Sequence, residues 1–227
     1  LTIGLDCWEP FGQASSMAPA RPARAPRRRT QEERSTDTRR RILDAALACL
    51  AEHGYAGTTT LAVAARPRVS RGAQLHHFPT RSSLVSAAVQ HLYRLLREDY
   101  ERGFAEIPPG ADRARAAIGL LWAAFQDERL TAVLELSIAA RTDADLAREL
   151  LPVSEAHHAH VVRLARDFFP EAAGDPEGFQ ATLDFVLDAL PGMAVRRLLR
   201  PGDPSIGLSL ARLEAMAASA LALRSRD

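Results

Sequence analysis

Apolar residues recur three and four positions apart along most of the chain, which is the period of an amphipathic α-helix. The first such segment predicts a helix over Thr38–His53. Thr36 or Asp37 is suited to cap its start, and Gly54 follows as a glycine that readily ends a helix. The apolar stripe of this helix consists of Ile42, Leu43, Ala46, Leu47 and Leu50.

Two much shorter helices follow, separated by a tight turn. Thr58 or Thr59 is placed to cap the first, which ends near Pro67 because proline cannot continue a helix. Ser70 caps the second, which stops at Phe78 because a residue before proline avoids helical conformation. Two short helices on a tight turn, the second polar on its exposed side, are typical of the helix-turn-helix that reads the DNA major groove.

From Thr80 onward the pattern predicts a longer, entirely helical portion with no competing strand pattern. Loops are indicated at 107–110 (IPPG), in the stretch FPEAAGDPEG and in RPGDPS. Pro152 and Pro191 fall inside apolar stripes, so we expect a kink or a fresh start at each.

Composition agrees with an all-α fold. Ala and Leu dominate, β-branched residues are sparse and aromatic residues make up 6%. We predict a disordered Arg- and Pro-rich arm over 1–35, a three-helix domain over 36–80 with its helix-turn-helix at about 59–78, and a larger helical bundle over 81–227. About nine helices are expected in total.

Charge is distributed unevenly along the chain. The net charge is only +1 and all 29 basic residues are arginine, yet residues 17–41 hold nine arginines against three acids. A basic arm on an acidic body suits contact with the DNA backbone and with an adjacent minor groove. A solvated tail is the alternative interpretation.

Other classes of protein are disfavoured. Two cysteines, Cys7 and Cys49, do not make a disulfide framework, and no apolar run approaches the ~20 residues that span a bilayer. No signal-peptide pattern opens the sequence, so we expect a cytoplasmic protein without membrane contact. Phosphate-binding glycine loops, GxSxG, HExxH and paired cysteines are absent from the sequence, which disfavours an enzyme.

Several linked segments resemble the TetR family of bacterial transcription regulators. RRRILDAALACLAEHGYAGTT is similar to the family's first helix and loop, and VSRGAQLHHFPTRSSL to its turn, recognition helix and following helix. The resemblance is strongest over Thr36–Tyr93. It implies an all-α homodimer with a ligand-binding and dimerising domain, whose last two helices, here Gly178–Leu199 and Ser205–Leu223, pair with those of the partner.

The sequence departs from the family pattern in three places. The turn carries Pro67-Arg68 where a small residue and glycine are usual, and Arg68 is unsuited to a positive φ. Gln74-Leu75 replaces the common Leu-Tyr, so Gln74 either turns toward DNA or packs inside. Pro191 falls within an expected dimer helix.

The resemblance and the helix pattern together predict the DNA contacts. Base or groove contacts are expected from the recognition helix, at Arg71, Gly72, Ala73, Leu75 and His76. Phosphate contacts, which fix register without reading sequence, are expected from Thr58, Thr60, His77 and Arg81. Alternatively, Leu75 and His77 close the three-helix core and Arg71 is a solvated charge.

An apolar pocket between bundle helices is the expected ligand site. The candidate ligand-binding residues are Trp122, Phe125, His157 and Phe168. Each aromatic could instead be ordinary core, and His157 a core histidine. His157 and His160 share a helix face, but no further ligand is placed by sequence to complete a metal site, so no metal or cofactor is predicted.

The leading hypothesis is a repressor that binds an inverted-repeat operator on double-stranded DNA as a homodimer and is released by a small, mostly apolar effector. A second hypothesis is a DNA-binding regulator without an effector. A third is an all-α enzyme or carrier whose small N-terminal domain is vestigial.

Overall fold

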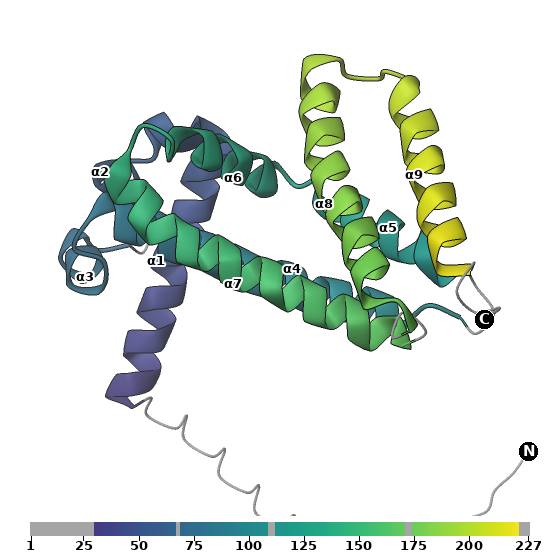
Figure 1. The fold of residues 1–227 in the computed structure, drawn as a ribbon. Coiled ribbons are helices and arrows are strands. Elements are labelled where there is room, and N and C mark those ends of the chain that lie inside the picture. The colour runs from purple at the N-terminus through teal and green to yellow at the C-terminus, as the bar shows by residue number, and fades with distance from the viewer. Residues whose placement is uncertain (1–29, 67–68, 109–111, 171–173, 223–227) are drawn as a thin grey trace, which may run out of the picture.

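The computed structural model describes residues 30–66, 69–108, 112–170 and 174–222, and the described residues are organised as helices joined by short loops (Figure 1). This confirms the predicted all-α class. The helices are α1 (Gln31–Gly57), α2 (Thr60–Ala64), α3 (Arg71–His77), α4 (Arg81–Ala105), α5 (Arg113–Ala124), α6 (Glu128–Ala139), α7 (Ala144–Phe168), α8 (Pro176–Leu199) and α9 (Ser205–Ala222).

Helix α1 begins earlier than the apolar pattern predicts. Its N-cap is Thr30, whose hydroxyl accepts from the backbone N–H of Glu33 while the Glu33 carboxylate accepts from the backbone N–H of Thr30. This reciprocal capping box satisfies two backbone donors that the helix start would otherwise leave unpaired. The predicted cap at 36–37 is therefore wrong, and residues 31–35 of the predicted arm are helical. Residues 1–29 of that arm lie outside the described residues.

Gly54 breaks α1 as predicted, although helical backbone resumes afterwards. Its φ of 63° and ψ of −172° lie in a region that residues with a Cβ rarely adopt. Thr59 then caps α2 and Ser70 caps α3, each hydroxyl accepting from the backbone N–H three residues on, and Phe78 ends α3. The predicted helix-turn-helix is thus present, with residues 67–68 of its turn outside the described residues.

The small head formed by α1, α2 and α3 shares its apolar core with the body. The core residues of α1, among them Ile42 and Leu50, join Val63 of α2, Leu92 of α4 and Leu136 of α6 in one buried cluster. Helix α1 packs against both α4 and α6, and α4 runs on along α7 (Figure 1). The head is consequently fixed to the body by apolar packing, not only by a linker.

The internal prolines do not divide their helices. Pro152 lies within α7 and Pro191 within α8, and both helices continue on either side of the proline. The expectation of a fresh start is therefore wrong. Leu150 near Pro152 in α7 and Leu190 beside Pro191 in α8 are both buried, and this packing holds the flanking turns in helical conformation.

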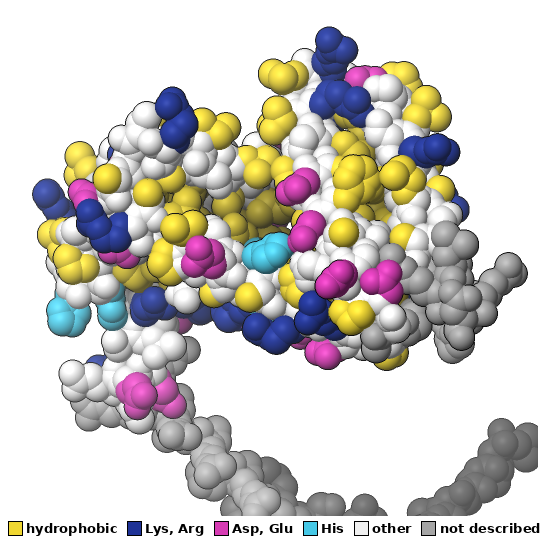
Figure 2. Space-filling view, in the orientation of Figure 1, with side chains coloured by type: hydrophobic (Ala, Val, Ile, Leu, Met, Phe, Trp, Pro, Cys, Tyr) yellow, Lys and Arg dark blue, Asp and Glu magenta, His cyan; other side chains and the backbone are white. Residues whose placement is uncertain are grey.

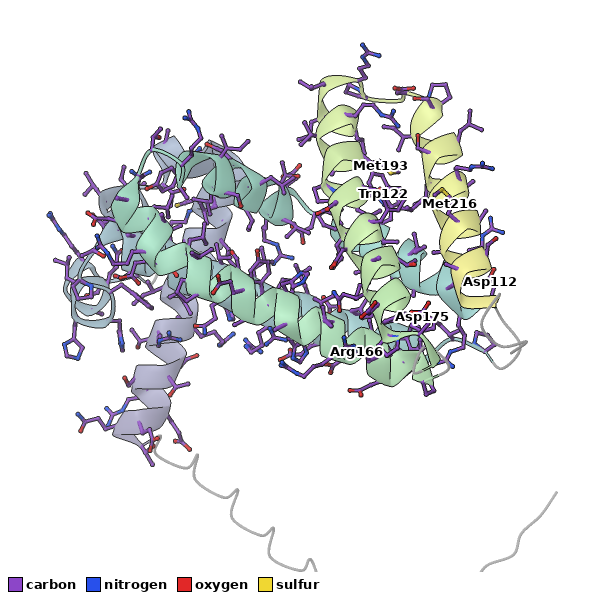
Figure 3. All side chains as sticks on the ribbon, in the orientation of Figure 1. Asp112, Trp122, Arg166, Asp175, Met193 and Met216 are labelled. Carbon is purple, nitrogen blue, oxygen red and sulfur yellow. The ribbon has the colours of Figure 1, made fainter. Side chains whose placement is uncertain are left out.

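Helices α8 and α9 form an antiparallel pair that packs on α5 (Figure 1). Their shared core includes Val186, Leu190, Met193 and Leu213, with Trp122 of α5 packed against it (Figure 3). None of the described helices is both long and apolar enough to span a bilayer.

Candidate functional site

Helix α3 lies at the edge of the molecule with one face open to solvent (Figure 1). Arg71, Gly72 and His76 are exposed, and Leu75 is 45% exposed. Ala73 and His77 are half-buried. The exposure of Leu75 excludes the interpretation that it closes the core. Of the predicted base-contact residues, Ala73 packs partly against the core and the others are exposed.

Gln74 is the residue of α3 that faces inward. Its side chain is fully buried, and its Nε2 donates to the carbonyl of Thr60 at 3.0 Å, which ties α3 to the start of α2. Its Oε1 has no hydrogen-bond partner among the described residues. Of the two interpretations of Gln74 left open by the sequence, packing inside is therefore the correct one.

Thr58 and Arg81, both expected as phosphate contacts, bond to the protein's own backbone. Thr58 is completely buried, and its hydroxyl donates to the carbonyl of Gly54 at 2.7 Å. Arg81 donates from Nε to the carbonyl of Thr58 at 2.8 Å and from its terminal nitrogen to the carbonyl of Tyr55, with its guanidinium over the Tyr55 ring. Both residues brace the loop between α1 and α2. The burial of Thr58 leaves its side chain no access to a phosphate in this structure, whereas the phosphate contact expected of Arg81, which is half-buried, stays a prediction.

His77 and Thr60 are both half-buried, and their phosphate contacts stay predictions. Burial, together with the charges of His76 and Arg39, lowers the pKa of His77, so its imidazole favours the neutral form. Arg39 of α1 lies over the Phe78 ring, 5.3 Å from its centroid, and carries a positive charge to the edge of the exposed face of α3. Sequence reasoning placed Arg39 only within the basic arm.

A cavity of about 260 Å³ lies in the body and is lined by residues of α4, α6, α7 and α8 and of the C-terminal end of α5. Figure 2 shows hydrophobic side chains gathered in the hollow between α7 and α8. The apolar wall includes Phe125 of α5, Val133 of α6 and Leu183 of α8, while α4 and α7 supply Arg97 and His157. A mostly apolar hollow with few polar groups is typical of small-molecule sites.

Two of the four predicted ligand residues line this cavity, Phe125 and His157. Trp122 instead packs against the core of α8 and α9. Phe168 stacks on Phe104 with ring centroids 4.0 Å apart, in an aromatic cluster at the far end of α4. Both are half-buried and pack against apolar clusters outside this cavity, which periodicity alone does not reveal.

His157 is stacked on Tyr93, and burial lowers its pKa to about 4, assisted by the charges of Arg97, His160 and His158. Its Nδ1 has no hydrogen-bond partner among the described residues. Within the same residues, no group of three His, Cys, Asp or Glu side chains is arranged to hold a metal ion.

Known proteins resemble the chain in both of its parts. A family model described as bacterial regulatory proteins of the tetR family matches residues 42–88, from α1 into α4. The HTH-type transcriptional regulator CymR of Pseudomonas putida is 30% identical over 174 residues, which cover 77% of this chain and 86% of CymR. The chain belongs to the TetR family.

Solved structures share the fold of this TetR-family chain. A TetR-family regulator from Rhodococcus sp. superimposes with a TM-score of 0.64 at 21% identity, covering 82% of this chain and 99% of the other. The multidrug binding protein EbrR, complexed with imidazole, gives a TM-score of 0.54 at 25% identity, covering 82% and 93%. The protein is therefore a DNA-binding helix-turn-helix transcriptional regulator, from a non-enzymatic family.

Sequence reasoning about this TetR-family regulator missed the contribution of α4 to the cavity. Tyr93, Leu96, Arg97 and Tyr100 all line it. Their spacing of three, four and seven positions places them on one helix face. That spacing is visible in the sequence. However, α4 has a more apolar stripe on another face, and this stripe alone predicts a packing face for the helix.

Proposed function

We propose that the protein is a repressor that binds an inverted-repeat operator as a homodimer and is released by a small, mostly apolar ligand. The observation that carries this proposal is that one helix, α4, both packs against the DNA-binding head and lines the cavity. A ligand that favours one position of α4 thereby changes the position of α3, and a ligand shifts an equilibrium only through such a difference in affinity.

The contacts of α4 with the head occur along its first half. Arg81, in its first turn, holds the carbonyls of Tyr55 and Thr58. Further along the helix, Nε2 of His91 lies 2.9 Å from Oδ1 of Asp44 on α1. The next turns carry Arg97, which lines the cavity. A ligand that displaces the second half of α4 would also move α1, because the contacts of α4 with the head leave little room for α4 to move independently.

A second connection joins the head to α6 and α7. The backbone N–H of Tyr55 donates to the Glu135 carboxylate of α6 at 3.0 Å, and the Tyr55 hydroxyl donates to Asp143, the N-cap of α7, at 2.7 Å. Helix α6 also lines the cavity. Tyr55 of the head is thus hydrogen-bonded to α6 and to the start of α7, and a ligand in the cavity would contact both helices.

The homodimer is supported by large apolar side chains left exposed on α8 and α9. They are Phe185, Val195, Leu198, Leu199, Leu208 and Met216. Pairing of these faces about a two-fold axis buries them and presents two α3 helices to DNA, which requires half-sites about one helical turn apart. Ligand binding is supported by related structures described as complexes with imidazole and with choline.

Genomic binding-site mapping followed by footprinting tests the proposal. We expect protection of a discrete inverted repeat, and loss of protection when a bound small molecule is added. Uniform protection of unrelated DNA would contradict operator recognition. A footprint that no cavity ligand removes would favour a regulator without an effector.

Sedimentation velocity tests the dimer. Phe185→Ser combined with Leu199→Ser should convert the dimer to a monomer, because both side chains are more than half exposed in the isolated chain. Ile138→Ser is the matched control, since Ile138 is 71% exposed but lies on α6. A wild-type monomer, or dissociation caused equally by the control, would contradict an α8–α9 interface.

A further inference from the structure

The two sides of the cavity differ in chemistry. Helices α5, α6 and α8 contribute apolar side chains and Ser137, whose hydroxyl donates to the carbonyl of Val133 at 2.9 Å. Among the described residues, the ionisable lining side chains all come from α4 and α7: Tyr93, Arg97, Tyr100, His157 and His158. None of the described residues that line the cavity is aspartate or glutamate. The cavity is therefore apolar on one side and cationic or neutral on the other.

Arg97 lacks the counter-charge that its neighbours on α4 have. Arg94 pairs with Glu98 at 2.6 Å, and Arg102 pairs with Asp99. In the described parts of the chain, no carboxylate lies within ion-pair distance of Arg97. Two nearby carboxylates face histidines instead: Glu101 of α4 lies 3.7 Å from His160, and Asp184 of α8 lies 3.7 Å from His158. A half-buried guanidinium beside an apolar cavity is stabilised by an anion, because low polarity strengthens that attraction.

We propose that the ligand is a small apolar molecule ending in one carboxylate, which pairs with Arg97 while its apolar body packs against Phe125, Val133 and Leu183. A guanidinium presents a planar pair of N–H donors that matches a carboxylate. The cavity volume of about 260 Å³ limits the body to a compact chain or a single ring system. This inference rests on the proposed function and identifies the ligand class of its effector site.

Tyr100 is a suitable second donor to the carboxylate. Burial raises the pKa of its hydroxyl, so the group stays protonated at neutral pH and can donate a hydrogen bond. A cationic ligand, in contrast, meets no acidic side chain among the described lining residues and is repelled by Arg97.

Isothermal titration of the full chain with two matched ligand series tests the proposal. One series is octanoate, octanamide and octylammonium, and the other is phenylacetate, phenylacetamide and phenethylammonium. In at least one series the carboxylate should bind roughly tenfold or more tightly than its amide, the size expected for a charge-assisted contact, and the ammonium more weakly still. Absence of binding by both carboxylates, or equal binding of the amides, would overturn the proposal.

Variants assign the preference to one side chain. Arg97→Gln should reduce the carboxylate preference to less than about threefold, Arg97→Lys should retain part of it, and Arg97→Glu should transfer it to the ammonium. Arg163→Gln is the charge-matched control, because Arg163 lies on α7 but does not line this cavity. A preference that survives in Arg97→Gln refutes the assignment. The comparison within the wild-type protein stands even if that variant fails to fold.

The binding measurement is independent of DNA, so its outcome is separate from that of the proposed function. Carboxylate binding without release of the operator would support the ligand class and contradict the repressor mechanism. Operator release by amides or ammonium ions alone would support the repressor mechanism and contradict the ligand class.

Discussion

The imidazole of His157 lies flat on the phenol ring of Tyr93, with ring centroids 3.7 Å apart and ring planes 4° from parallel. This stack joins α7 to α4 at the wall of the cavity. It packs best with a neutral imidazole, because burial and the nearby charge of Arg97 both oppose protonation. The contact therefore links the protonation state of one residue to the packing of two helices.

Acid should weaken the fold through His157. Its folded pKa is about 4, below the ~6.5 of an unfolded histidine. The group is neutral in both states well above pH ~6.5, and as pH falls below that value the unfolded chain binds the proton first. Its contribution is thus present at neutral pH and lost progressively toward pH 4, reaching a loss of about 2 kcal/mol near pH ~5.

Urea unfolding at about pH 7.5 and about pH 5 measures this effect. His157→Phe keeps a ring that can stack on Tyr93 and removes the titration, so the wild type should lose about 2 kcal/mol more than the variant between the two pH values. Equal losses in the two proteins would show that His157 does not contribute to acid sensitivity.

Gly54→Ala should destabilise the junction between α1 and α2. The φ of +63° disfavours any Cβ, and a Cβ built there lies 2.6 Å from Oε2 of Glu135. We expect a loss of about 1–3 kcal/mol in the free energy of unfolding. Glu135→Ala is not a clean test of the steric part, because it also removes the acceptor of the Tyr55 backbone N–H.

Gly119→Ala provides the opposite control. A Cβ at this position in α5 meets no heavy atom of the described residues within 4 Å, so alanine should stabilise the helix by about 0.5–1 kcal/mol. Chemical denaturation of the wild type and both glycine variants gives the comparison. A neutral Gly54→Ala would contradict the positive-φ conformation of this residue.

Arg71→Ala tests direct reading of DNA by α3. Arg71 is exposed at the first position of the helix, where a guanidinium can bond bidentately to a guanine. We expect a loss of about 1–3 kcal/mol on the cognate site and relaxed preference at one symmetric position, measured by competition against random-sequence DNA. An equal loss on both DNAs would restrict Arg71 to phosphate contact.

Removal of residues 1–29 tests the basic arm. The segment 17–29 carries five arginines, whereas residues 1–16 carry none. The longer deletion should reduce the slope of log affinity against log salt by about 0.9 for each phosphate that the arm neutralises, and deletion of 1–16 should leave it unchanged. An unaltered slope after the longer deletion would exclude the arm from DNA binding.

Local rules predicted the elements of the head well. The hydroxyls of Thr59 and Ser70 each accept from a backbone N–H three residues on, and Gly54 adopts a backbone conformation that other residues disfavour. These features therefore follow from neighbouring residues alone. The capping box at Thr30 and Glu33 is equally local. It was not predicted, because the surrounding arginines and prolines are typical of a disordered tail.

The site residues were predicted less completely from the sequence than the helices of the head. The sequence by itself determined that Arg71 and His76 lie on the exposed side of α3, but it left open that Gln74 is buried and Leu75 exposed. Only the tertiary structure decided that Thr58 is buried, that Arg81 is occupied by backbone carbonyls, and that the cavity wall includes Arg97. These outcomes depend on which helix faces meet across long sequence separations, and periodicity gives the faces of a helix but not their partners.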